Sequence, residues 1–351
     1  MKYFLNETEA KKLVALFDQH KKNIDYLLHL SSIIWQDNGF DTIVFKGKNT
    51  FEKRTLFVDE LLQKYRISDP FVSKAIRWDT NLIDAREFIN NPYFKALQNV
   101  NFDANDWKLQ QKVMSAYTLF PYEEEYHYGD NAIIKMNLGF FDQDYSYPTI
   151  TLCDREWMSL NPFEIRTMQI PIQLARGKVL TLGLGLGYFA YMTHLKDDVN
   201  EVHIVEMDVD LIKTFNQYLL PLFPHPEKIH IHKADAFYFI EQIKDHDYDF
   251  IFSDLWHDVS DGLPMYLKLK KRFNDFKYTR CTYWIEGSLV TYLRSLVIGV
   301  LKDEYYPQEA DYDELQQLIM NNLKNYTISN NYDLDKLLSI NGLNQLLFKK
   351  E

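Results

Sequence analysis

The sequence predicts an α/β protein with a doubly wound, mostly parallel sheet, and three observations support this. Five β-rich runs repeat between residues 175 and 302, and a helical stretch lies between each pair. Parallel strands need such crossovers, which are right-handed and cover both faces of the sheet. Glycine or an acid ends four of the runs, where ligands of such sheets bind. The expected strands are KVLTL, EVHIVE, KIHIHK, YDFIFSD and CTYWIE.

The rest of the chain divides into three further zones. Residues 1–130 have short amphipathic patterns and are expected to be mostly helical, with Asn6 opening the first helix. Residues 131–174 form a small element in which NAIIKMNLGFF and PTITLCD pair as a β-hairpin. A helix follows, with Asn161 as its N-cap. Residues 303–351 are expected to be a helical extension.

Composition places the chain among globular proteins. It has 351 residues, 46% of them hydrophobic, and a net charge of −11. That charge argues against nucleic-acid or membrane partners. Only Cys153 and Cys281 are present, so no disulfide framework is expected. With no secretory pattern and no apolar run of membrane-spanning length, a cytoplasmic location is expected.

A glycine-rich stretch, GLGLGY, follows the first strand. Its glycines are Gly183, Gly185 and Gly187. Glycine lets a backbone turn tightly into a helix and approach a ligand closely, although glycines also simply close turns. The dinucleotide fingerprint requires Gly or Ala where this chain has Tyr188, so the pattern is G-x-G-x-G instead.

Acids end the next three strands. Glu206 stands where a carboxylate accepts the hydroxyls of a ribose, although a strand-end acid can also be plain surface. Asp235 either caps the following helix or meets an adenine amino group. Asp254 ends the fourth strand. Together these acids and the glycines form a constellation at consecutive strand ends.

The constellation resembles the S-adenosylmethionine-dependent transferases with a Rossmann-like methyltransferase sheet, and within them the spermidine synthase group. The matching stretches are VEMD, ADAF and YDFIFSD, and the resemblance covers residues 131–302. It implies that the three glycines pass the methionine and ribose portions of the cofactor. It also implies roles for the strand-end residues. These are Glu206 on the ribose, Met207 on the adenine face, Asp235 and Ala236 at the adenine, and Asp254 at the transfer site.

The pattern departs from that group at positions that matter for amine recognition. The group has an aspartate in the glycine loop where this chain has Leu186, and a second acid after the fourth strand where it has His257. Asp258 follows one position later. A Tyr-His-Glu run of the group is replaced by Ile165, Arg166 and Thr167. Aminopropyl transfer therefore cannot simply be inherited from the resemblance.

The stretch DLWHD leaves two interpretations open. Asp254, His257 and Asp258 can form a catalytic cluster in which a neutral imidazole removes a proton from the acceptor. Alternatively, His257 only begins a solvated loop. Trp256 either stacks on substrate or covers the sheet edge.

Two weaker features carry no assignment at this stage. His230 and His232 alternate on one strand and share a face, but no third ligand stands at a recognisable spacing, so no metal is expected. The acidic and aromatic stretch 122–130 is interpreted as a solvated loop rather than a site for a cationic substrate.

These observations favour an S-adenosylmethionine-dependent enzyme that transfers a methyl group to a small-molecule acceptor. Attack on the sulfonium would be in line, with Asp254 or His257 removing a proton. One alternative is an aminopropyltransferase with altered amine recognition that uses decarboxylated S-adenosylmethionine. Another is a non-catalytic protein that keeps the nucleoside pocket. The family's habit of pairing suggests a homodimer.

Overall fold

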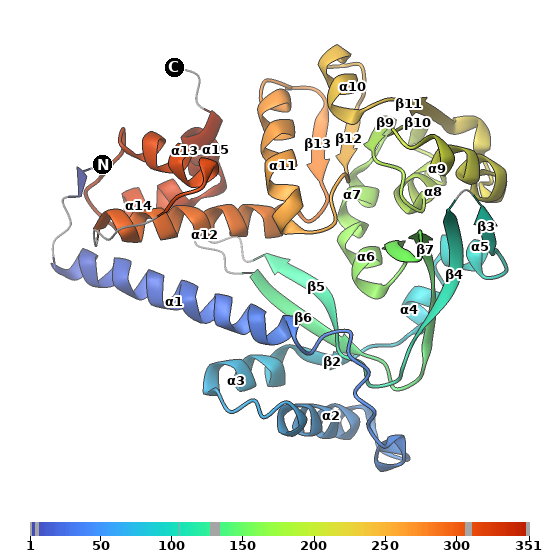
Figure 1. Ribbon diagram of the computed structural model, residues 1–351, viewed down its shortest axis with the longest axis horizontal. Coiled ribbons are helices and arrows are strands. Elements are labelled where there is room, and N and C mark those ends of the chain that lie inside the picture. Colours follow the sequence, from blue (N-terminus) through green and yellow to red (C-terminus); the bar gives the residue numbers. More distant parts are fainter. Residues whose placement is uncertain (1, 4–6, 105, 127–133, 306–310, 349–351) are drawn as a thin grey trace.

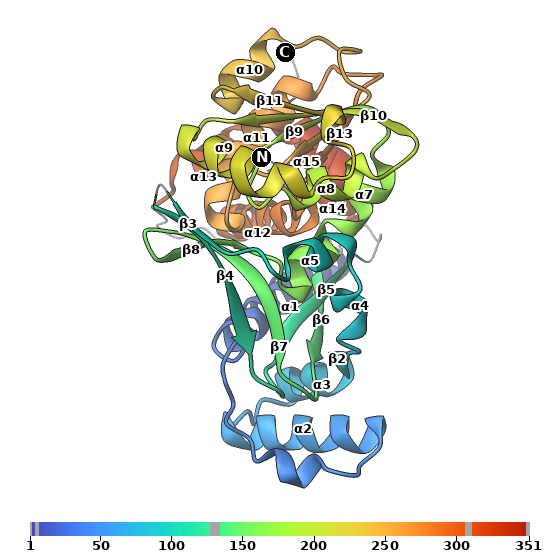
Figure 2. The ribbon, with the colours of Figure 1, turned by 90° about the vertical axis from the view of Figure 1, so that its right-hand side faces the viewer.

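A computed structural model gives the structure of the chain, and it describes all residues except 1, 4–6, 105, 127–133, 306–310 and 349–351. Figure 1 shows the parallel sheet with its helices in the upper part, and Figure 2 shows a second, extended β region and the helix α2 beneath it. In the described part of the chain, no helix combines the length and the apolar character needed to cross a bilayer.

The central sheet confirms the predicted fold class. Five strands lie in the order β11-β10-β9-β12-β13, and every neighbouring pair is parallel. The order reverses between β9 and β12, which is the Rossmann-like arrangement with its switch point between these two strands. All five expected strands are present. They are β9 (Gly177–Leu182), β10 (Val199–Glu206), β11 (Ile229–Lys233), β12 (Phe250–Ser253) and β13 (Arg280–Tyr283).

The crossover helices begin where local capping chemistry places them. Asp208 accepts backbone N–H groups at the start of α9, and Asp235 does so at the start of α10. Asp258 opens α11 with a capping box, so this helix starts well before Pro264. The helices are α8 (Tyr188–His194), α9 (Val209–Thr214), α10 (Ala236–Gln242), α11 (Val259–Phe273) and α12 (Glu286–Tyr305), and a π turn (Phe215–Leu219) and 3-10 turns (Leu220–Leu222, Pro226–Lys228) follow α9.

The prediction that residues 1–130 are mostly helical is wrong beyond about residue 100. Helices dominate only the first part: α1 (Glu7–Ser31), a 3-10 turn (Thr42–Phe45), α2 (Thr50–Lys64), α3 (Pro70–Asp79), α4 (Arg86–Ile89) and α5 (Pro92–Leu97). Strands follow: β2 (Thr80–Leu82) among the helices, then β3 (Phe102–Ala104), β4 (Trp107–Met114) and β5 (Phe120–Tyr126). The middle of β4 is polar and exposed, and β5 carries an acidic run, so neither shows a strand's apolar alternation.

The predicted hairpin within 131–174 is also wrong in its pairing. The two runs are strands, β6 (Ile134–Phe140) and β7 (Tyr145–Leu152), but they belong to different sheets. β6 pairs with β2 and β5, whereas β7 pairs with β4 and with β8 (Arg155–Ser159). Each run thus pairs with a strand from the segment that was expected to be mostly helical, and the short link at residues 141–144 passes from one sheet to the other.

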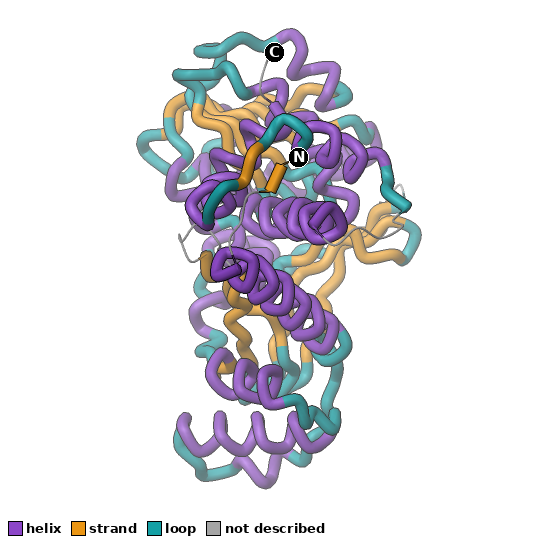
Figure 3. Tube along the Cα trace, turned by 90° about the vertical axis from the view of Figure 1, so that its left-hand side faces the viewer, coloured by secondary structure: helices purple, strands orange, loops and turns teal. Residues whose placement is uncertain are grey.

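Helices on either side of the sheet complete the fold. The predicted helix at residue 161 is present with Asn161 as its cap and Pro162 at its first position, and it is split into α6 (Pro162–Thr167) and α7 (Gln169–Leu174). The C-terminal extension is helical as expected. It contains α13 (Glu314–Leu323), α14 (Asn331–Leu338) and α15 (Ile340–Phe348), together with β14 (Thr327–Ile328), which pairs with β1 (Lys2–Tyr3). The long helices α1 and α12 contact each other (Figure 3).

Candidate functional site

The candidate site lies at the switch point, where the loop after β9 meets the end of β12. Gly183 adopts φ +99°, and a Cβ there would come within 2.1 Å of the carbonyl oxygen of Asp254. Only glycine permits this approach and this backbone conformation. The structure therefore brings the predicted glycine loop and the predicted transfer-site acid directly together.

The other two glycines bring side chains from elsewhere onto the loop. Gly185 has φ +50° and is covered by the sulfur of Met158, a residue of β8. That sulfur accepts a hydrogen bond from the backbone N–H of Leu186, at 3.2 Å. Gly187 has φ +76° and faces the ring of Phe215. The loop is thus a packed turn with a thioether lying against its backbone.

Helix α5 fastens the glycine loop from its other side. The hydroxyl of Tyr93, a fully buried residue, donates to the carbonyl oxygen of Leu186. The amide of Asn91 donates to the hydroxyl of Tyr188 at 2.8 Å. Leu186 itself is fully buried. Its side chain therefore packs in the core. It cannot take the role of the aspartate that the spermidine synthase group has at this position.

Glu206 joins β10 to the glycine loop. Its carboxylate accepts hydrogen bonds from the backbone N–H groups of Leu184 at 3.2 Å, Met207 at 2.7 Å and Asp208 at 2.8 Å. A carboxylate offers about four acceptor positions, so capacity remains for a ligand hydroxyl. Glu206 therefore connects the loop after β9 to the loop after β10. It is not an isolated surface acid, which was one of the two interpretations of the sequence.

The adenine-side residues are separate from this network. Met207 is 67% exposed, and a thioether there is free to cover a flat ring. Asp235 accepts the backbone N–H of Tyr238 at 2.8 Å, so its helix-capping role is present. Ala236 is buried as the first residue of α10. Nothing in the geometry assigns Asp235 to an adenine amino group, and that role stays a prediction.

Asp254 is an acid with a strongly raised pKa at the switch point. Burial raises the pKa of its carboxyl from 3.8 to about 7. In the part of the chain that the structure describes, no hydrogen bond or ion pair engages this carboxyl. An acid with a pKa near neutrality and no partner is typical of a group that binds a ligand or accepts a proton from it.

A second acid, which the sequence did not reveal, lies near Asp254. Burial raises the pKa of Glu164, on α6, well above its ordinary value, and the charges of Asp254 and Glu156 raise it further. The Glu164 side chain also lacks a hydrogen-bonding partner among the described residues. Two carboxyl groups with raised pKa values thus lie in one region. Local sequence carried no signal for this, because Glu164 reads as an ordinary first-turn helical acid.

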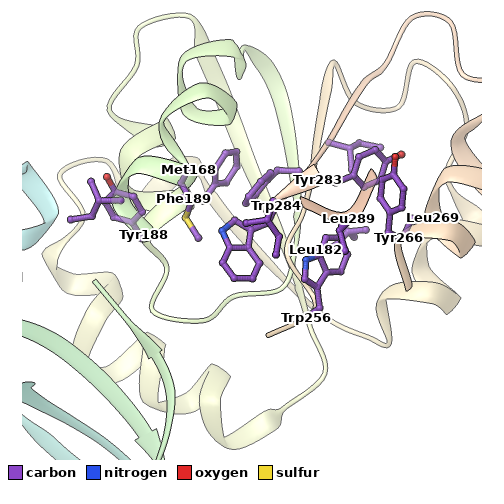
Figure 4. Packing of buried hydrophobic residues seen from close by; sticks show 14 of the residues in the cluster. Met168, Leu182, Tyr188, Phe189, Trp256, Tyr266, Leu269, Tyr283, Trp284 and Leu289 are labelled. Atoms are coloured by element: carbon purple, nitrogen blue, oxygen red, sulfur yellow. The ribbon is translucent and has the colours of Figure 1, made fainter. Parts of the chain in front are cut away.

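A small hollow, part of it open to solvent, lies between the glycine loop and Asp254. Apolar residues are the majority of its lining, but its accessible surface is mainly polar, and Asp254 is the one carboxylate among the lining residues. Figure 4 shows Met168, Tyr188 and Phe189 at this end of the buried cluster. The lining comprises Met158, Met168, Thr181, Gly183, Leu184, Tyr188, Phe189, Ala190, Ile204 and Asp254.

His257 and Asp258 make contacts at the start of α11. His257 is exposed, contacts Asp261 through Nδ1 at 3.0 Å and packs edge-on against Trp157. Asp258 accepts the backbone N–H of Ser260 at 2.7 Å. These contacts fit the solvated-loop interpretation of His257. No contact joins either side chain to Asp254, and their catalytic roles stay predictions.

Trp256 is buried among residues of α11 and α12, and its substrate role stays a prediction. It is 5% exposed and packs with Leu289 against Gly262 (Figure 4). Its indole N–H is buried, with no hydrogen-bond acceptor in the described structure. Such a donor costs free energy when left unpaired.

The residues that replace the Tyr-His-Glu run have structural contacts. Ile165 is buried, and Arg166 pairs with Glu87 at 2.5 Å and lies over the ring of Tyr122. Thr167 accepts the indole N–H of Trp284 at 2.9 Å. These three side chains hold α6 in place. The acidic stretch 122–130 lies partly outside the described residues, and nothing supports a substrate role for it.

Comparisons with known proteins give little similarity. No protein-family model matches the sequence, and no curated protein matches it significantly. One solved structure, a spermidine synthase from Thermotoga maritima, aligns with a TM-score of 0.32 and 14% identity over 43% of this chain and 58% of that chain. The chain thus spans less than two thirds of that enzyme. A spermidine synthase in complex with the transition state analogue AdoDATO aligns with the same score and identity, over 50% and 68%.

The class of protein therefore follows from this chain's own fold and site. The parallel sheet has the Rossmann-like order. Its switch point carries a glycine loop, a glutamate that accepts a hydrogen bond from this loop, and an aspartate with a raised pKa. Sheets of this order bind nucleoside ligands at that position.

Proposed function

We propose that the chain is a transferase that binds an adenosyl sulfonium cofactor and moves an aminopropyl group to a small-molecule amine. The observation that carries the proposal is that Asp254, next to the glycine loop, lies close enough to Glu164 for its charge to raise the pKa of that second carboxyl group. This proposal takes the place of methyl transfer, which the sequence favoured before the second carboxyl group was visible.

The pair suits an amine acceptor. A protonated amine is attracted by carboxylates, and the attraction is stronger where the charges are partly shielded from water. It must then lose a proton before its nitrogen can attack, and an acid with a pKa of about 7 is well matched to receive it. The nitrogen forms a bond to the propyl carbon, the carbon–sulfur bond breaks, and its electron pair stays on sulfur as a neutral thioether. Asp254 takes the proton.

The same pair selects between cofactors. S-Adenosylmethionine carries a carboxylate that the Asp254 and Glu164 carboxyl groups repel when they are ionised, whereas its decarboxylated form presents only an ammonium group on the propyl arm. Glu164 lies on the α6 side of Asp254 and supplies a carboxyl group that the loop position Leu186 lacks. We therefore propose decarboxylated S-adenosylmethionine as the cofactor.

Calorimetric titration tests this with three ligands: S-adenosylmethionine, its decarboxylated form and methylthioadenosine. We expect the decarboxylated form to bind at least tenfold more tightly than S-adenosylmethionine, and Glu164→Gln to remove most of that preference. Glu227→Gln, at an exposed acid outside the site, is the matched control. Equal or reversed affinities would return the assignment to methyl transfer.

Turnover is tested separately by incubating the protein with decarboxylated S-adenosylmethionine and a panel of diamines and triamines. Formation of methylthioadenosine that depends on the amine supports the proposal. Tight binding without product from any amine favours the non-catalytic alternative, which the placement of Met158 over the glycine loop also suits.

A further inference from the structure

Three histidines and a glutamate lie together on one face of the sheet, away from the site described above. Glu201 and His203 share a face of β10, and His203 stands beside His230 in the parallel register with β11. His232 lies one pleat further along β11. Their ring centroids are close: His203 is 4.8 Å from His230 and 5.0 Å from His232.

Hydrogen bonds define how His203 is held. Its Nε2 lies 2.9 Å from the carboxylate of Glu201, and its Nδ1 lies 2.7 Å from Nε2 of His232. An ionised carboxylate only accepts, so Nε2 of His203 carries a proton and, in the neutral ring, Nδ1 accepts from His232. The neutral imidazole that this hydrogen-bond pattern requires of His203 is the form that coordinates metal ions.

We propose that Glu201, His203 and His230 bind a divalent transition-metal ion, with zinc as the best match. Their ligand atoms lie within 4.8 Å of one another, and each side chain supplies one. Imidazole nitrogen and carboxylate oxygen are common zinc ligands, at about 2.0–2.2 Å from the metal. Three protein ligands with a water molecule in the fourth position complete a tetrahedral site.

His232 orients the site without coordinating the ion. When the metal takes the place of the proton on Nε2 of His203, that ring carries its proton on Nδ1 and donates it to Nε2 of His232. The distance of 2.7 Å already suits this bond. A ligand histidine usually has such a partner for its second nitrogen, and the partner fixes the ring and its tautomer.

Neighbouring side chains determine how a metal ion could reach the cluster and what competes with it. The Lys178 ammonium lies 3.4 Å from the Glu201 carboxylate and competes with a metal for it. Its side chain is 41% exposed, so it can move toward solvent. Tyr248 packs edge-on against His203, and Phe239 packs against His232, so the inner side of the cluster is closed. His203 is only 9% exposed, and access is from the side of the more exposed His230.

The position gives the ion a structural role. The proposed ligand His203 precedes Glu206 by three residues on β10, which is about 10 Å along the strand, and Glu201 is further away. β11 is the edge strand of the sheet, with no neighbour beyond it in the described sheet order (Figure 1). A metal ion that joins β10 to β11 therefore secures the edge strand that leads into Asp235 and α10.

Metal titration of the full, chelator-treated chain tests the proposal. We expect one Zn²⁺ per chain with a micromolar or lower Kd in calorimetry, and visible absorption typical of tetrahedral coordination with Co²⁺. Zn²⁺ should also raise the melting temperature, because it binds the native state. Absence of saturable binding, or a Co²⁺ spectrum typical of six-coordinate hydration, would overturn the site.

Variants assign the binding to these residues. His230→Ala and Glu201→Gln, at the more exposed positions, should each weaken Zn²⁺ binding at least tenfold while the circular dichroism spectrum stays unchanged. His29→Ala, an exposed helical histidine, should leave Kd unchanged, and an equal loss in that control would refute the assignment. His232→Gln should weaken binding roughly 10- to 100-fold, as expected for a partner of a ligand. Lys178→Met should tighten it. None of these measurements depends on the transferase activity.

Discussion

The Glu206 carboxylate accepts a hydrogen bond from the backbone N–H of Leu184, so the end of β10 holds the glycine loop that follows β9. The same carboxylate accepts the N–H groups of Met207 and Asp208. One side chain thereby fixes the two loops between which a ribose would lie. Affinity for a nucleoside and order in the loop should therefore be lost together.

Replacing Glu206 with alanine tests this coupling. Three backbone N–H groups lose their acceptor, and each lost bond costs about 0.5–1.5 kcal/mol. We expect a lower free energy of unfolding and at least a tenfold loss of affinity for methylthioadenosine, measured by urea denaturation and calorimetry. Glu241→Ala, at an exposed acid on α10, should change neither. Unchanged nucleoside binding in Glu206→Ala would show that the strand-end assignment is wrong.

Gly183→Ala should be strongly destabilising. The alanine Cβ would lie 2.1 Å from the carbonyl oxygen of Asp254, and the backbone has φ +99°. We expect a loss of more than about 3 kcal/mol in the free energy of unfolding, or no folded protein. Gly299→Ala is the matched control: this glycine lies within α12 with open space around it, so alanine should stabilise by about 0.5–1 kcal/mol. Similar losses in both variants would contradict the close approach.

The pKa of Asp254 predicts a pH-dependent stability. Since the folded-state pKa is about 7, against an ordinary value of 3.8, the native state holds this proton more strongly than the unfolded state does. Ionising Asp254 therefore lowers stability as the pH rises from about 4 to about 7. Asp254→Asn removes that cost, so it should be more stable than the parent at pH 7.5, on the order of 1–3 kcal/mol, with little difference at pH 4.

Asp84→Asn provides a control of opposite sign. The Arg86 side chain donates to Asp84 and lowers the pKa of that carboxyl to about 2. Its contribution is present at neutral pH and is lost as the pH falls through that range. Asparagine should therefore reduce stability at pH 7.5, measured by urea denaturation. If Asp254→Asn were instead less stable than the parent at pH 7.5, the Asp254 carboxylate would have a stabilising partner, and the prediction would be wrong.

The strands of the central sheet could be predicted because their signals are local. Short apolar runs, alternating helices and capping residues such as Asp208 and Asp235 each depend on a few neighbouring positions. The order of the strand ends also indicated where Glu206 and Asp254 would meet the glycine loop. These predictions needed no knowledge of packing.

The features that the sequence missed depend on pairing between distant segments. Glu164 reaches Asp254 across 90 positions, and no local pattern marks it. The strands β4 and β5 carry polar and acidic residues, so only their pairing with β7 and β6 identifies them. In the same way, His230 lacked a further metal ligand until the register of β10 and β11 placed His203 beside it.

Met158 offers the sharpest test of how a ligand reaches the glycine loop. Its sulfur lies over Gly185 and accepts the Leu186 backbone N–H, so it covers the surface on which the methionine arm of a cofactor would lie. Binding in that place requires the Met158 side chain to leave, which costs the packing of a partly buried residue. Removing the side chain beforehand removes that cost.

Met158→Ala should therefore bind decarboxylated S-adenosylmethionine several-fold more tightly than the parent while the unliganded protein loses about 1–2 kcal/mol of stability. The Met158 side chain contributes to the folded state without ligand, and a ligand that displaces it replaces the same contacts. Met136→Ala, at a partly buried methionine of β6 away from the loop, should lower stability without any gain in affinity. Calorimetry and urea denaturation on both variants separate the two effects. Weaker binding in Met158→Ala would mean that this methionine is part of the ligand pocket and stays in place when the cofactor binds.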